Sequence, residues 1–153
     1  MPDETNGLEP FNSRHVVCEL PDYNIKMKLL FLQLNGSMLI WIGDEEGRLS
    51  GLSVCLPSNV AESIQQHSTI IYSVNSTTTN SCDQTACQSF SEYEENLSRK
   101  LSKRLNCPVF VSISLSSEYI PLWNSVHFTT GSTFGQEVER HLFDNLSSFV
   151  PSK

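Results

Sequence analysis

The residues in this sequence most able to do chemistry are a few cysteines, histidines and carboxylates, and their spacing decides whether they could form a site. Cys82 and Cys87 have four residues between them, and together with His67 or Asp83 they could chelate a metal ion. This spacing matches no common zinc module, so two thiols in a loop are the favoured interpretation. We therefore expect no metal and no other cofactor.

Motifs for nucleophilic catalysis or nucleotide binding are absent from the sequence. The histidines stand in no nucleophile motif and in no metal-binding spacing; they are His15, His67, His127 and His141. There is no G-x-S-x-G, no P-loop and no G-x-G-x-x-G, and the segment 43–47 (GDEEG) puts carboxylates where a phosphate would need bare amides. The sequence therefore indicates a protein that is not an enzyme.

The charge and the cysteine content exclude several classes of partner and compartment. A formal net charge of −7 argues against a general binder of nucleic acid or of anionic membranes, because phosphates would repel most of the surface. No apolar run approaches the ~20 residues of a membrane helix. The acidic start, MPDETNGLEP, has no apolar core, so we interpret residues 1–13 as a disordered tail and not as a targeting segment. The odd number of cysteines, 5, indicates reduced thiols in the cytoplasm.

One group of cations stands out in this acidic chain. Arg99, Lys100, Lys103 and Arg104, here called the basic cluster, are four of the ten lysines and arginines and lie within two predicted helical turns. They could form a solvated helix face, since cations suit the negative end of the helix dipole, and this is the commoner situation. They could also form a docking patch for an acidic surface.

The elements that must position these residues follow from apolar periodicity and from turn signals. We expect strands at 14–20, 27–34, 37–42, 49–56, 68–74 and 108–115, a short helix at 59–66, and two main helices at 91–105 and 133–149. This order predicts an α+β fold with a mostly antiparallel sheet and two flanking helices. Residues 14–150 then form a single domain, and the Ser/Thr/Asn-rich stretch 75–91 is a mobile insertion.

Both main helices show a capping-box pattern and an apolar stripe. Ser91 with Glu94, and Thr133 with Gln136, have the spacing in which two side chains satisfy the first helical amides. The stripes recur every four residues; they are Tyr93, Leu97, Leu101 and Leu105 in one helix, and Phe134, Val138, Leu142 and Leu146 in the other. Two such stripes can cover about one face of a sheet.

The segment 28–43, KLLFLQLNGSMLIWIG, predicts a hairpin that is apolar on both faces. A two-residue turn at Asn35-Gly36 pairs Leu34 with Ser37, Leu32 with Leu39 and Leu30 with Trp41. One face then carries Leu30, Leu32, Leu39 and Trp41. The other face carries Leu29, Phe31, Met38, Ile40 and Ile42, and this purer apolar surface suits the helices.

The first of these faces needs a cover of its own. Burying three leucines and one tryptophan contributes on the order of 6–10 kcal/mol, and leaving them wet would create an apolar patch that binds a partner or aggregates. The cover could come from the chain itself, as a sandwich or a crossing N-terminal segment, or from another protein. The pattern leaves both alternatives open.

The next predicted strand alternates regularly. In the segment 49–56, LSGLSVCL, strict alternation puts Leu52, Val54 and Leu56 on one face and Gly51, Ser53 and Cys55 on the other. The large and the small side chains are therefore segregated onto opposite faces of one strand.

Several segments of the chain together resemble the proteasome assembly chaperone 4 family. They are LFLQLNGSMLIWIG, GLSVCL and LSRKLSKRLNCPVFVSISL, followed by a C-terminal amphipathic helix. The resemblance covers most of 27–56 and 97–149 in the same order, and it is most specific at Trp41-Ile42-Gly43 and around 104–111. It implies a β-sheet with flanking helices, with one sheet face available for dimer packing.

The resemblance also implies a non-catalytic function. Members pair, sheet against sheet, with a related chaperone-3 subunit, and the heterodimer holds α-type subunits of the 20S proteasome while the α-ring assembles. This implies a partner interface at Leu30, Leu32, Leu39 and Trp41, and client docking through the basic cluster. It implies the cytoplasm, with the nucleus as a second compartment. The alternative is a longin- or profilin-like adaptor in trafficking or the cytoskeleton.

Overall fold

The structure is a computed structural model, and it describes residues 12–57, 68–73 and 89–150. The short helix expected at 59–66 and nearly all of the Ser/Thr/Asn-rich stretch at 75–91 lie outside these residues. Among the described helices, none is long and apolar enough to cross a membrane.

A six-stranded sheet organises the described residues, with the strands in the order β1-β2-β3-β6-β4-β5. Its strands are β1 (Asn12–Leu20), β2 (Ile25–Leu34), β3 (Ser37–Gly43), β4 (Gly51–Cys55), β5 (Ser68–Ser73) and β6 (Val109–Ser114). All neighbouring pairs are antiparallel except β3 and β6, which are parallel. The predicted α+β fold with a mostly antiparallel sheet is confirmed, and β1 begins two residues before the expected start at 14.

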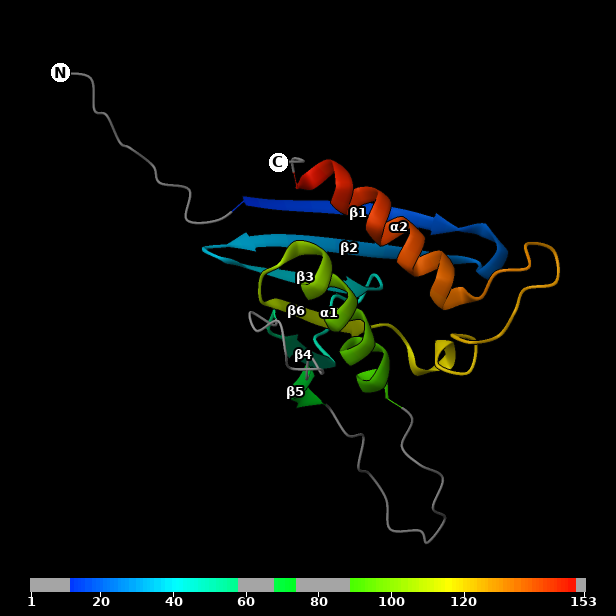
Figure 1. The fold of residues 1–153 in the computed structure, drawn as a ribbon. Coiled ribbons are helices and arrows are strands. Elements are labelled where there is room, and N and C mark those ends of the chain that lie inside the picture. Colours follow the sequence, from blue (N-terminus) through cyan, green and yellow to red (C-terminus); the bar gives the residue numbers. More distant parts are fainter. Residues whose placement is uncertain (1–11, 58–67, 74–88, 151–153) are drawn as a thin grey trace, which may run out of the picture.

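Both main helices, α1 (Ser91–Leu105) and α2 (Phe134–Phe149), lie on the same face of this sheet (Figure 1). Short 3-10 turns, η1 (Pro21–Tyr23) and η2 (Ser117–Tyr119), lie at the start of two of the connections. The helical stripes are buried at Leu97, Leu101, Phe134, Val138, Leu142 and Leu146. The core therefore lies between the helices and one sheet face.

The hairpin has the register that its turn predicts. Leu34 is opposite Ser37, Leu32 is opposite Leu39, and Leu30 is opposite Trp41. The face assigned to the helices is fully buried, with Phe31, Ile40 and Ile42 at 0% exposure. This assignment is confirmed.

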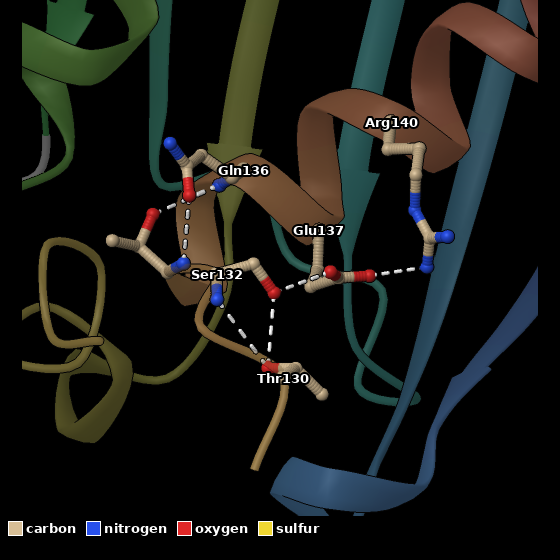
Figure 2. A network of polar contacts seen from close by, with 6 residues as sticks. Thr130, Ser132, Gln136, Glu137 and Arg140 are labelled. Atoms are coloured by element: carbon tan, nitrogen blue, oxygen red, sulfur yellow. Dashed lines mark hydrogen bonds and ion pairs between the residues drawn. The ribbon is translucent and has the colours of Figure 1, made fainter. Parts of the chain in front are cut away.

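The two predicted capping boxes have different outcomes. At α2, Gln136 N–H donates to Thr133 Oγ1 at 3.2 Å and Thr133 N–H donates to Gln136 Oε1 at 2.9 Å (Figure 2). At α1 the prediction is wrong, because the N-cap residue is Phe90 and its side chain makes no capping hydrogen bond. Glu94, the expected capping partner, is instead turned into the core and is 1% exposed.

Candidate functional site

The sheet face opposite the helices, called here the open face, is apolar across its four central strands. Pairing places on it half-buried side chains from β2, β3, β6 and β4; they are Leu30, Leu32, Leu39, Trp41, Phe110 and Val54. On the edge strand β1, Val17 is opposite Lys28 and is 53% exposed. The four predicted partner-interface residues thus share one continuous surface with side chains from other strands.

β4 adds to the open face because its large side chains, and not its small ones, point away from the helices. Its small side chains face α1, because Gly51, Ser53 and Cys55 are buried. Leu52 and Val54 are half-buried on the other face, and Leu56, just after the strand, is 62% exposed. An ordinary covered strand would turn its leucines toward the helix and its serine toward water.

The buried carboxylate of Glu94 explains why α1 takes the small side of β4. The ladder between β4 and β6 ends at Ser53 and Val111, and Glu94 Oε1 accepts the next amide, Ile113 N–H, at 2.8 Å. Glu94 Oε2 accepts from Ser53 Oγ at 3.2 Å. A Cβ atom at Gly51 would lie 2.6 Å from Oε1, so only glycine leaves room for the carboxylate.

Burial also changes the acidity of this group. Burial raises the pKa of Glu94 from 4.5 to about 6, and the hydrogen bonds from Ile113 and Ser53 oppose this rise. Sequence reasoning missed this role because Glu94 also fits a capping box. The available signal was the serine and glycine side of β4, which is too small and too polar to pack against an apolar stripe.

Trp41 is held in place on the open face. Its indole N–H donates to the Arg48 carbonyl oxygen at 3.0 Å, and Ser50 N–H donates to Ser114 Oγ at 3.0 Å. The connection 44–50 is thereby tied to β3 and β6. This explains why Ser112 and Ser114 are buried although they lie on the same face of β6 as Phe110. Trp41 therefore presents a preorganised, half-buried ring.

The basic cluster is not a uniform free patch. Lys100 Nζ bonds both carboxylate oxygens of Glu139 on α2, at 2.8 and 2.9 Å. Arg104 reaches Ser147 at 3.3 Å and lies 4.9 Å from the centre of the Phe143 ring, also on α2.

The other two members of the cluster point elsewhere. Arg99 contacts Asn96 and, at 3.4 Å, Ser68 of β5. Lys103 is exposed and has no hydrogen bond or ion pair with the described residues. The structure thus keeps all four cations on the outside of α1, but two of them link the helices and a third reaches toward β5.

The structure does not test the residues considered for metal binding. Cys82, Cys87, His67 and Asp83 lie outside the described part of the chain. Within residues 12–57, 68–73 and 89–150, no group of three or more His, Cys, Asp or Glu side chains is placed to hold a metal ion. Cys18, Cys55 and Cys107 are free thiols.

The fold and the open face define an α+β protein whose single sheet carries both main helices on one side and an apolar surface on the other. The family model for proteasome assembly chaperone 4 matches residues 25–115, a span that includes β2, β3, β4, β6 and α1. The chain belongs to the proteasome assembly chaperone 4 family. Membership assigns it a chaperone role in proteasome assembly.

A solved structure has the same fold. It is described as the crystal structure of a novel chaperone complex for yeast 20S proteasome assembly, and it is similar to this chain with a TM-score of 0.60. The sequences are 10% identical, and the match covers 91% of this chain and 97% of that chain. No curated protein matches the chain.

Proposed function

We propose that this protein is a non-catalytic chaperone that pairs through its open face with a related chaperone-3 subunit. The heterodimer holds α-type subunits of the 20S proteasome in the cytoplasm and nucleus while the α-ring assembles, and no metal, cofactor, nucleic acid or membrane takes part. The observation that carries this proposal is the orientation of β4. A strand that gives its small side to the helix and its leucines to the outside is suited to a second protein layer.

The chemistry of the open face fits a stable partner. It combines leucines, a valine, a phenylalanine and the fixed ring of Trp41, with Lys28 and His15 toward its edge. Aromatic and aliphatic side chains surrounded by polar ones are typical of the centre of a protein interface. Fixing Trp41 before binding reduces the conformational entropy lost when the partner arrives.

A temporary client requires a different surface. A chaperone that must leave cannot hold its client through a large apolar interface, so polar contacts are expected. The basic cluster is our candidate for such a contact. Lys103 is its most suitable member because it is exposed and forms no hydrogen bond or ion pair with the described residues.

Pairing can be tested with a charge placed on the open face. We expect Leu32→Glu to prevent a 1:1 complex with the chaperone-3 subunit in co-expression followed by size-exclusion chromatography with light scattering. Gln33→Glu is the matched control, because it adds the same group at the next position of β2, where the side chain is already exposed. Trp41→Glu should act like Leu32→Glu, but it also removes the bond to Arg48, which makes Leu32 the cleaner position.

The outcome separates the two candidate functions. Normal pairing by Leu32→Glu would contradict the assignment of the interface to the open face. A wild-type chain that remains a soluble monomer and ignores the chaperone-3 subunit would contradict the pairing itself. In that case a longin- or profilin-like adaptor, which should bind a small GTPase, a coat protein or actin, becomes the better proposal.

The client contact can be tested by reversing charges. We expect Lys103→Glu to weaken capture of α-type subunits at low salt while pairing with the chaperone-3 subunit is unchanged. Lys103→Arg is the matched control, because it keeps the exposed positive charge at the same position. Equal capture by the wild type and by Lys103→Glu would leave the basic cluster as a solvated helix face.

A further inference from the structure

The connection before α2 carries the most exposed large apolar side chain described in the structure. Val126 and Thr133 form an antiparallel bridge, and the residues between them make a small hairpin with Phe128 near its tip. Phe128 is 91% exposed and Val126 is 62% exposed. Figure 1 shows this connection projecting beyond the ends of the strands. Aromatic side chains such as phenylalanine are enriched at protein interfaces relative to the rest of the protein surface.

Internal hydrogen bonds hold this hairpin, here called the Phe128 hairpin (126–133), in one shape. His127 N–H donates to the Ser132 carbonyl at 2.9 Å, and Gly131 N–H donates to the His127 carbonyl at 2.8 Å. Gly131 has φ +70°, a conformation that other residues rarely adopt. Thr129 Oγ1 lies 2.7 Å from Nδ1 of His127.

The hairpin is also tied to the first turn of α2. Ser132 Oγ donates to Glu137 Oε1 at 2.6 Å and bonds Thr130 at 3.0 Å, and Arg140 pairs with the other oxygen of Glu137 (Figure 2). The hydrogen bond from Ser132 holds the pKa of Glu137 below its ordinary value. The tip is therefore built on a helix whose own capping box is complete.

A run of aromatic contacts connects the tip to the core. Phe128 stacks on His127 with ring centres 5.1 Å apart, and His127 packs on Tyr23 at 5.4 Å. Tyr23 in turn contacts the buried ring of Phe134 at 4.9 Å. A side chain that is both exposed and fixed loses little conformational entropy when it is bound.

The position of the hairpin keeps it accessible when the open face is paired. Its anchors, Phe134 and Glu137, belong to α2, which lies on the opposite face of the sheet. It also lies outside residues 25–115, the span matched by the family model. Within the basic cluster, Arg104 contacts Ser147, ten residues or about 15 Å along α2 from the anchor Glu137, whereas Lys100 contacts Glu139, two residues from that anchor.

The surroundings of the hairpin indicate the charge of its partner. Tyr119, which stacks on Phe134, lines an open cavity of about 750 Å³ at this end of the sheet. Four carboxylates and one amine also line this cavity; they belong to Glu19, Asp44, Glu45, Glu46 and Lys26. A partner that covers both Phe128 and this cavity meets negative charge at the cavity and is favoured if that part of its own surface is basic.

We propose that the Phe128 hairpin is a second contact with the α-type client, in which Phe128 enters an apolar pocket with a basic rim. This inference rests on the proposed function. It gives the heterodimer two attachments, one basic on the helices and one aromatic at the end of the sheet with an acidic cavity nearby. Each is small, so the client can be held firmly and still be released when either contact is lost.

The direct test places a photo-reactive group at the tip. The heterodimer carrying Phe128→p-benzoylphenylalanine is irradiated with each purified α-type subunit, and the crosslinked residue is identified by mass spectrometry. We expect a crosslink to an α-type subunit at an apolar residue with lysine or arginine nearby. A crosslink to the chaperone-3 subunit, or none to any α-type subunit that the heterodimer binds, would overturn the proposal.

Affinity provides the second test. We expect Phe128→Ser to weaken capture of that α-type subunit about tenfold or more, with unchanged pairing and unchanged thermal unfolding, because the side chain is exposed. Phe128→Tyr should restore capture, and Ser125→Ala, at an exposed position just before the hairpin, is the matched control. An equal loss in Ser125→Ala, or no loss in Phe128→Ser, would contradict a role for the ring.

Two further outcomes are distinguishable. If the wild-type heterodimer captures no α-type subunit, the proposed function fails, and the hairpin proposal fails with it. If it captures one and Phe128→Ser captures it equally well, only the hairpin proposal fails. Binding of the wild type to neutral phosphatidylcholine vesicles, lost in Phe128→Ser, would replace the protein client by a membrane surface and overturn the proposal.

Discussion

The indole ring of Trp41 lies over Gly43, two residues further along β3, and a Cβ atom at position 43 would stand 2.1 Å from Cζ2 of the ring. The indole N–H donates to the Arg48 carbonyl in the connection that follows the strand. Glycine at position 43 thus permits the ring orientation that fixes this connection. Gly43 therefore helps to set how Trp41 is presented on the open face.

Replacing this glycine should displace the ring. We expect Gly43→Ala to lower the free energy of unfolding by about 1–3 kcal/mol, because the added methyl group overlaps the indole. Chemical denaturation followed by tryptophan fluorescence measures this loss. In a Trp41→Leu background the same substitution should cost clearly less, and equal costs in both backgrounds would show that the ring is not responsible.

The buried carboxylate of Glu94 should make stability depend on pH. Because its pKa is raised in the folded state from 4.5 to about 6, the folded protein takes up this proton more readily than the unfolded chain. The contribution of Glu94 is therefore most favourable below pH 4.5 and is lost as the pH rises through about 6. At pH 7.5 the ionised form costs about 2 kcal/mol.

The variant Glu94→Gln isolates this effect. Its amide oxygen can accept from Ile113 N–H, and its amide nitrogen can donate to Ser53 Oγ, so both contacts are kept without a charge. We expect it to be more stable than the wild type at pH 7.5 and nearly equal at pH 4.5 in urea unfolding. Glu92→Gln, exposed in the same helical turn, is the control. The same difference in both variants would contradict a specific role for Glu94.

The ion pair between Lys100 and Glu139 should contribute to helix packing. Lys100→Glu places two carboxylates together, and we expect a loss of about 1 kcal/mol in the free energy of unfolding. Exchanging both charges, in the double variant Lys100→Glu with Glu139→Lys, should restore most of it. A double variant that regains stability but not client capture would separate the structural role of Lys100 from a docking role.

The cap of α2 should be measurable on its own. Thr133→Ala removes the acceptor for Gln136 N–H, and we expect it to cost about 1 kcal/mol. Thermal unfolding monitored by circular dichroism measures the loss. The adjacent variant Ser132→Ala leaves this acceptor in place and should instead raise the pKa of Glu137, which NMR titration of the carboxylate detects. An unchanged pKa would contradict the assigned hydrogen bond.

Local patterns in the sequence predict much of this fold correctly. The turn at Asn35-Gly36 determines the register of β2 and β3, and alternation then separates Phe31 and Ile40 from Leu32 and Leu39. The Thr133 capping box and the stripe of α2 are equally local. Each of these features depends on residues a few positions apart, which is why the pattern is sufficient.

Features that depend on distant segments could not be predicted in this way. The parallel pairing of β3 with β6 joins Ile40 to Val111, and nothing in either strand specifies the other. Glu94 fits a capping box by spacing, but an unpaired amide at Ile113 makes a buried position more favourable. The basic cluster is visible in the sequence, whereas the contact of Lys100 with Glu139 depends on how the helices pack.

The place of β6 in the sheet has a consequence for how the chain folds. β6 lies between β3 and β4, yet its residues, Val109–Ser114, follow both strands by more than fifty positions. On the ribosome, the β2–β3 hairpin can form early, but it cannot join β4 until residue 114 has left the exit tunnel. Such long-range closure slows folding and leaves apolar strands unpaired during synthesis. A protein that assists the assembly of others is thus itself exposed to aggregation while it is being made.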